Sequence, residues 1–216
     1  KKYWTTVTGT DSQTLPSCIF AYLDQLKTII LPSGIRNIEK SAFYRNTSLT
    51  TVKLPYNLRS IDGYAFEGCE NLTDLTIPSY VERIDKFAFS GCSSLTSIKI
   101  PSGVKTIAEG SFKNCSKLAA IGLPAGLTTM GKGAFQGCGF TQVVVPDGIT
   151  TISDGLFANC SKLTSITLPK GLKTIEDGAF MGCGFTEFVV PDGITTISNN
   201  LFAYCGNLTS ITLPKD

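Results

Sequence analysis

Cysteine has the widest chemical repertoire of the residues in this chain, and its spacing is regular. The chain has 216 residues and eight cysteines, and seven of these follow one another at intervals of 22 or 23 residues. Recurring cysteines form disulfides, bind zinc, or serve as small buried apolar groups with a weak S–H donor. Cys18 lies outside the series, and we expect it to be an exposed or reactive thiol. The regular series is Cys69, Cys92, Cys115, Cys138, Cys160, Cys183 and Cys205.

Acid–base and nucleophilic catalysis find little support. The chain contains no histidine, which excludes Ser-His-Asp and Cys-His arrangements and any histidine-containing metal triad. Aspartates recur at the entry to a short polar stretch of each unit, where we expect them to cap a turn rather than to exchange protons. These aspartates are Asp62, Asp85, Asp154 and Asp177. The sequence predicts a protein that is not an enzyme and uses no metal or cofactor.

The prolines and phenylalanines show the period of the repeated units in which these cysteines and aspartates lie. Nine of the ten prolines lie 22 or 23 residues apart, and a phenylalanine follows eleven residues after each of the first eight. A period of this length indicates stacked supersecondary units that form a solenoid. The prolines are Pro32, Pro55, Pro78, Pro101, Pro124, Pro146, Pro169, Pro191 and Pro214.

Each unit combines a strand with tight turns. Apolar residues such as Leu95, Ile98 and Ile100 alternate with polar ones before the proline, the period of a half-buried strand. Proline ends the strand because it has no N–H to donate, and segments such as 146–148 (Pro-Asp-Gly) suit a type I turn. The polar stretch before each phenylalanine is too short for a regular helix and predicts one helical or 3₁₀ turn.

Stacking such units places equivalent residues in columns. Neighbouring strands pair in parallel about 4.8 Å apart, so roughly nine coils form a rod about 40 Å long. Parallel cysteines in one column point the same way, which disfavours the disulfide dihedral, and a line of thiols does not offer zinc a tetrahedron. We therefore favour a structural column of buried thiols that bond to the neighbouring turn, with disulfides and metal binding as less favoured alternatives.

Two longer features subdivide the chain. Residues 124–168 and 169–213 are identical at 32 of 45 positions, which indicates duplication of a two-coil block. The two 22-residue units have lost one residue just after Cys138 and Cys183, and we expect a loop to absorb the loss. Residues 1–19 break the period and are predicted to form an N-terminal cap or leader, while residues 20–216 form the repeat domain.

The outward-facing strand positions are the candidate site for a partner. Because side chains alternate along a strand, the residues between the buried ones lie together on one surface. The alternative is a sheet surface without a binding role, whose threonines simply favour strand conformation. The candidate partner-binding residues are Thr51, Lys53, Asp74, Thr76, Ser97, Lys99, Gln142, Val144, Glu187 and Val189.

The pattern L-x-x-I-x-L-P-x-x-L-x-x-I-x-x-x-A-F-x-x-C, nearly complete in residues 92–115, resembles the BspA-type (Treponema pallidum-type) leucine-rich repeat. The resemblance covers residues 20–216. It implies a right-handed coil with a parallel β-sheet on the concave face, and short 3₁₀ or helical turns and irregular segments on the convex side. Proteins of this family are mostly bacterial surface or secreted proteins, and several resemble adhesins.

The resemblance implies a non-enzymatic extracellular or cell-surface module that adheres to host or other cells through its concave strand face. The expected partner is a host matrix or cell-surface protein, or else a glycan. A net charge of +2 with 17% charged residues argues against nucleic acid as a partner. The chain has no run of 18 apolar residues, so the sequence does not predict membrane insertion. We expect a signal peptide and an anchor to lie outside this stretch. The alternative function is a structural stalk that displays another domain.

Overall fold

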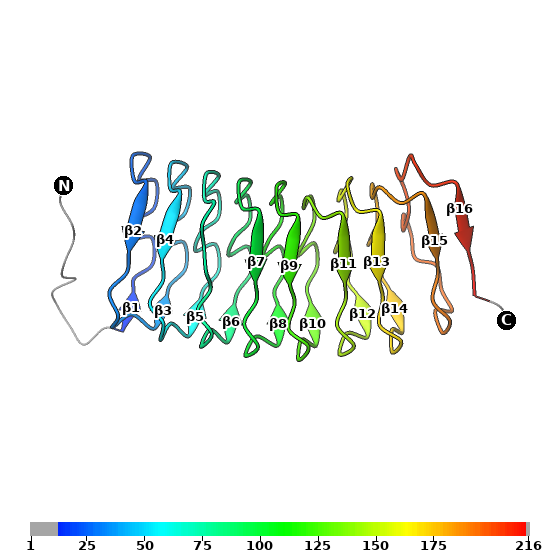
Figure 1. Cartoon of the computed structure of the whole chain (residues 1–216), viewed down its shortest axis with the longest axis horizontal. Helices are drawn as coiled ribbons and strands as arrows, with labels where there is room; N and C mark the ends of the chain where they lie inside the picture. The colour runs from blue at the N-terminus through cyan, green and yellow to red at the C-terminus, as the bar shows by residue number, and fades with distance from the viewer. Residues whose placement is uncertain (1–12, 215–216) are drawn as a thin grey trace.

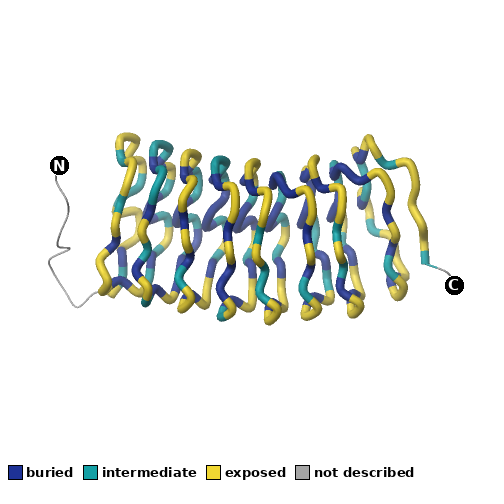
Figure 2. Tube along the Cα trace, in the orientation of Figure 1, coloured by how far each residue is buried: buried dark blue, intermediate teal, exposed yellow. Residues whose placement is uncertain are grey.

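The protein is a parallel-strand solenoid of about nine turns, which confirms the predicted fold class. The computed structural model describes residues 13–214, and within that range the coils stack into a rod without any helix (Figure 1). Two sets of short strands follow the rod, one before and one after the proline turn of each coil. Figure 2 shows buried positions recurring along every coil, and nearly all of the buried residues are apolar.

The first set of strands precedes the prolines and is called the first ladder. Its three-residue strands pair in parallel as β2–β4, β7–β9, β11–β13 and β15–β16. In most of them the middle residue points inward and the flanking residues are exposed, as the alternating sequence predicts. The strands are β2 (Thr28–Ile30), β4 (Thr51–Lys53), β7 (Ser97–Lys99), β9 (Ala120–Gly122), β11 (Gln142–Val144), β13 (Ser165–Thr167), β15 (Glu187–Val189) and β16 (Ser210–Thr212).

The second ladder consists of two-residue strands, which follow the proline turns in all coils but the first. Six of them form one sheet in the order β1-β3-β5-β6-β8-β10, and β12 pairs separately with β14. The ladder begins inside the segment predicted to be a cap or leader; residues 1–12 of that segment lie outside the described residues. The strands are β1 (Thr14–Leu15), β3 (Asn37–Ile38), β5 (Ser60–Ile61), β6 (Arg83–Ile84), β8 (Thr106–Ile107), β10 (Thr129–Met130), β12 (Thr151–Ile152) and β14 (Thr174–Ile175).

The segment around each phenylalanine forms a third ladder, here called the turn ladder. Alternate N–H groups bond within the coil to the residue three positions earlier, and the others bond to the next coil. Ser41, Phe43 and Arg45 donate to the carbonyls of residues 63, 65 and 67, at 3.0, 2.8 and 2.7 Å. Ser41 and Arg45 have φ of 58° and 54°, and the same two positions have positive φ in the other coils described. The two left-handed residues of each coil turn alternate amides toward the neighbouring coil. The segment therefore forms a series of consecutive tight turns, where the sequence predicted one helical or 3₁₀ turn.

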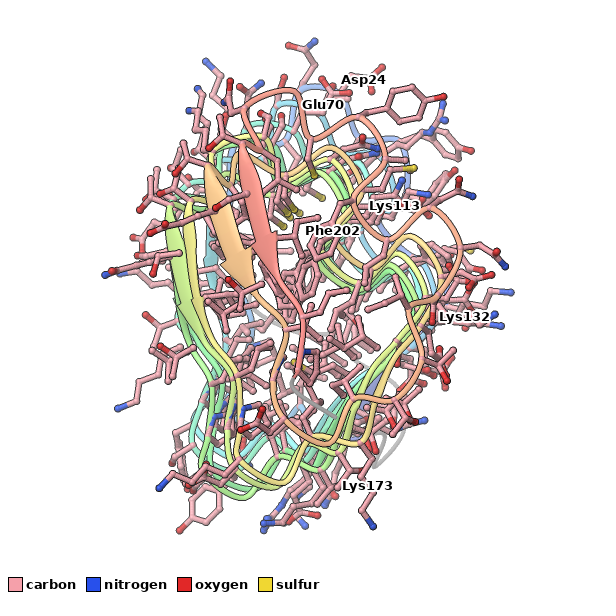
Figure 3. All side chains as sticks on the ribbon, turned by 90° about the vertical axis from the view of Figure 1, so that its right-hand side faces the viewer. Asp24, Glu70, Lys113, Lys132, Lys173 and Phe202 are labelled. Carbon is pink, nitrogen blue, oxygen red and sulfur yellow. The ribbon has the colours of Figure 1, made fainter. Side chains whose placement is uncertain are left out.

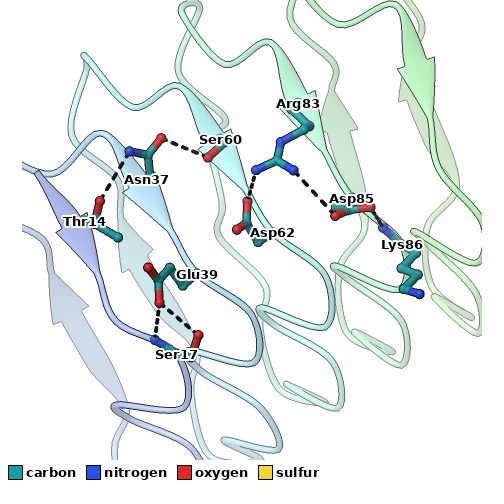
Figure 4. A network of polar contacts seen from close by, with 9 residues as sticks. All are labelled: Thr14, Ser17, Asn37, Glu39, Ser60, Asp62, Arg83, Asp85 and Lys86. Atoms are coloured by element: carbon teal, nitrogen blue, oxygen red, sulfur yellow. Dashed lines mark hydrogen bonds and ion pairs between the residues drawn. The ribbon is translucent and has the colours of Figure 1, made fainter.

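Most of the carboxylates at the entry to the turns bridge coils. Asp177 accepts a 3.0 Å bond from the N–H of Asn199 in the next coil, and Glu39 accepts 2.9 Å bonds from the N–H and Oγ of Ser17 in the preceding one. Arg83 links Asp62 and Asp85 across adjacent coils (Figure 4). The prediction that aspartates cap their own turns is wrong for Asp62, Asp154 and Asp177. The N–H groups directly after Asp154 and Asp177, and those two and three residues after Asp62, already bond within the turn ladder.

The core contains a continuous stack of phenylalanine rings. Successive rings lie 4.9–6.1 Å apart between centroids, and their planes differ by 27° or less. This offset parallel packing is a favourable geometry for aromatic pairs. The rings belong to Phe20, Phe43, Phe66, Phe89, Phe112, Phe135, Phe157, Phe180 and Phe202. The stack fixes the coils in register from one end of the described chain to the other.

The two 22-residue units interrupt the strand ladders. No described residue of β9 pairs with β11, or of β13 with β15, and Figure 1 shows wider gaps at both places. The turn ladder continues there, with Gly133 donating to residue 154 at 3.0 Å. The buried rings of Phe140 and Phe185 stand where other units have leucine, edge-on to Phe135 and Phe180. The lost residue falls in the loops 139–141 and 184–186, as expected, but these loops do not absorb it fully, because the strand pairing is lost there.

Candidate functional site

The outer surface of the first ladder, here called the strand face, brings all ten candidate residues onto one side of the rod. Nine are exposed, and Thr51 is half-buried. Direct pairing aligns them in columns: Lys99 lies beside Gly122, Val144 beside Thr167, and Val189 beside Thr212. Asp74 joins the ladder through an isolated bridge to Thr51. The side chains are therefore positioned by backbone hydrogen bonds between coils.

The strand face presents lysines on its earlier coils and valines on its later ones, with exposed Ile30 beside Lys53 and exposed Glu187 on the strand of Val189. Lys53 and Lys99 form no ion pair within residues 13–214, so both ammonium groups remain open to a partner. Val144 and Val189 are 68% and 67% exposed, which is high for residues in paired strands. Each valine lies on the first strand after one of the two ladder breaks. The surface thus offers cations and apolar groups at separate, fixed positions.

Aromatic residues at the proline turns extend this surface, and the sequence reasoning did not select them. Tyr56 is 70% exposed and follows Pro55 directly at the end of the β4 coil. Tyr80 is 51% exposed, and the guanidinium of Arg59 lies 4.9 Å from the centre of its ring. A tyrosine at position 80, where most other units have glycine, was the available signal. Tyrosine and arginine often dominate the energetics of protein interfaces.

The seven regularly spaced cysteines form one column in the core. Each Sγ lies 3.1–3.2 Å from the carbonyl oxygen of a phenylalanine in the preceding coil, in position to donate its proton. Burial raises the pKa of the Cys69 and Cys160 thiols to about 12. All eight cysteines are free, and Cys18 is exposed. The column holds neutral thiols whose protons bond to the neighbouring coil.

Asn46 occupies the cysteine position of its coil and is fully buried. Its Oδ1 accepts a 2.7 Å hydrogen bond from the N–H of Leu23, while its Nδ2 has no partner. An unpaired buried donor carries a desolvation cost, so this coil is held less well than those with cysteine.

Other chemistry has little structural basis in the described chain. Between residues 13 and 214, no group of three or more His, Cys, Asp or Glu side chains is arranged to hold a metal ion. The same range has no helix with the length and apolar character needed to cross a membrane.

A parallel-strand solenoid of 22- and 23-residue units, with columns of buried apolar residues and stacked phenylalanines, is the architecture of the class of leucine-rich repeat proteins. The sequence model described as "BspA type Leucine rich repeat region" matches in six copies over residues 13–141 and 128–216. The chain belongs to this family.

Solved structures of bacterial leucine-rich repeat proteins share the fold. One from Bacteroides ovatus superposes with a TM-score of 0.87 at 26% identity, covering 94% of this chain and 59% of its own. The Treponema pallidum leucine-rich repeat protein gives 0.70 at 32% identity, covering 75% and 78%. A leucine-rich cell surface protein from Faecalibacterium prausnitzii gives 0.59 at 22% identity, covering 92% and 82%. The comparison with curated proteins gave no match.

Proposed function

We propose that this chain is the protein-binding module of a bacterial surface or secreted protein and that it adheres to host or other cells through the strand face. The observation that carries the proposal is the exposed row of Lys53, Lys99, Val144 and Val189 on a hydrogen-bonded scaffold. Leucine-rich repeat folds generally bind proteins and are generally not enzymes. The description of the F. prausnitzii relative as a cell surface protein supports the location.

The chemistry of the surface favours a protein partner. Broad interfaces combine an apolar centre with a polar rim and gain affinity from a few aromatic and arginine anchors. The valines supply apolar contact, the lysines supply charge, and Tyr56 and Tyr80 supply rings at one edge. Because the scaffold is already ordered, little conformational entropy is lost when it docks.

The test replaces Lys53, Lys99, Val144 and Val189 together with alanine and measures adhesion of the full protein to cultured cells and to immobilised matrix. We expect at least a tenfold loss of apparent affinity, with the circular dichroism spectrum unchanged. The matched control replaces Lys86 and Lys173, two exposed lysines off the strand face, and removes the same charge. Unchanged adhesion of the folded fourfold variant would refute the proposal. Treating the cells with protease or with periodate separates a protein partner from a glycan.

The second candidate function is a stalk that holds another domain away from the cell. Duplication of residues 124–168 as 169–213 favours it, because copying a block lengthens the rod while preserving its internal packing. Deleting residues 124–168 separates the two functions. A stalk tolerates the shortening, whereas a binding face loses Gln142 and Val144 and with them affinity.

A further inference from the structure

A shallow pocket lies on the turn side of the rod, away from the strand face. Lys113 and Lys132 stand beside it, and Figure 3 shows both on the side of the coil opposite the first ladder. Its volume is about 160 Å³, below the roughly 300–1,000 Å³ typical of pockets for drug-sized ligands. The pocket therefore has room for about one small ring.

One wall of the pocket is the end of a second, short aromatic stack. Tyr64 and Phe87 occupy the first positive-φ position of their turns, and their rings stack at 5.4 Å with planes 13° apart. The next three residues in this column are Gly110, Gly133 and Gly155, all with positive φ. The Phe87 ring leans over Gly110, where a Cβ would come within 2.2 Å of it. Tyr64 packs on one face of Phe87, and Phe87 is also one of the residues that line the pocket.

The remaining walls carry hydrogen-bonding groups of both kinds. Lys113 and Lys132 donate, Glu109 and Asp154 accept, and Gln136 does both. Lys132 and Asp154 form a 3.4 Å ion pair across adjacent coils. Two cations balance two anions, so the pocket has no net charge to attract a phosphate or a free metal cation. A ligand with several hydroxyl groups, each able to donate and accept, matches this set.

We propose that this turn-side pocket binds one pyranose ring of a glycan. The ring packs its C–H face against Phe87, because aromatic faces carry negative partial charge and attract the positive edges of C–H bonds. Its hydroxyl groups bond to Gln136, Lys113 and the carboxylates. Gly110, Gly133 and Gly155 line the pocket without side chains, which leaves room for the sugar. This site is independent of the strand face and its protein partner.

The test uses saturation-transfer NMR with three probes: methyl β-D-glucopyranoside, methyl β-D-galactopyranoside and methyl α-D-mannopyranoside. Two variants remove the site in different ways. Phe87→Ala deletes the wall, and Gly133→Tyr fills the pocket with a residue that position 64 already accommodates at φ 62°. Tyr56→Ala is the control, since it removes an exposed ring that does not line the pocket.

At least one glycoside should bind the unmodified protein, and its dissociation constant should rise at least tenfold in both pocket variants and stay unchanged in Tyr56→Ala. The fourfold strand-face variant should also keep sugar binding, which separates this proposal from the proposed function. Absence of binding by all three glycosides would overturn the proposal. So would binding that survives both pocket variants, or equal loss in the control.

Discussion

Replacing Phe112 with alanine tests whether the phenylalanine stack holds the coils together. The ring is fully buried and stacks on Phe89 at 5.3 Å and on Phe135 at 5.9 Å. Truncating a buried phenylalanine costs about 3–5 kcal/mol. With an ordered ring on each side, little can collapse into the cavity, so we expect a loss of about 4–5 kcal/mol in the free energy of unfolding.

The matched control is Phe202→Ala at the end of the same stack. Phe202 is only half-buried, and within the column it stacks on one ring, Phe180, at 6.1 Å. Removing a ring that is incompletely buried should cost about 1–2 kcal/mol. Urea unfolding followed by far-UV circular dichroism measures both variants. If the two losses agree within about 0.5 kcal/mol, the rings do not couple neighbouring coils as a solenoid requires.

Two further predictions concern the column of thiols. Asn46→Cys should stabilise the protein by about 1 kcal/mol, because the thiol removes the unpaired buried Nδ2; a lower unfolding midpoint would contradict this. Stability should also fall as pH rises from about 9 to about 12, because burial keeps the folded thiols of Cys69 and Cys160 protonated while unfolded thiols ionise near 9.0. For each such thiol, the free energy of unfolding falls by up to about 1.4 kcal/mol per pH unit over this range. Melting curves of a variant with alanine at both positions should therefore show a shallower decline of stability with pH than those of the parent.

The columns and the strand face could be predicted from the sequence because they follow from period alone. Prolines at fixed spacing end the strands, and alternation before them, as at Ile98 and Lys99, decides which side chain points outward. The resemblance to BspA-type repeats rested on the same regularity, and the family match agrees with it.

The conformation of the turn ladder was harder to predict. Its left-handed positions hold Tyr64 and Phe87 as well as glycines, and bulky residues give no local signal of positive φ. Hydrogen bonds to the neighbouring coil stabilise that conformation, so it depends on contacts that are distant in sequence. For the same reason, the carboxylates bridge coils where local capping rules place them on their own turns.

The consequence of the missing residue in the 22-residue units also depended on packing. The sequence shows Cys-Gly-Phe at residues 138–140 and 183–185, but the opening of the strand ladders and the edge-on packing of the two rings appear only in the stacked structure. Gly139 fits there only because it lacks a side chain, since a Cβ would lie 2.4 Å from the carbonyl oxygen of Ser116. Such close approaches are properties of the stacked coils.

Counting reactive thiols in the folded protein tests most directly whether successive coils stack in register. Seven sulfurs lie inside the column, and only Cys18 is exposed. Reaction with Ellman's reagent at pH 8 should release one equivalent rapidly, with Cys205 of the last coil next and the remaining six only on unfolding in guanidinium. Rapid reaction of several thiols in the folded protein, or a total below eight after unfolding without reductant, would contradict the stacked column of free, buried cysteines.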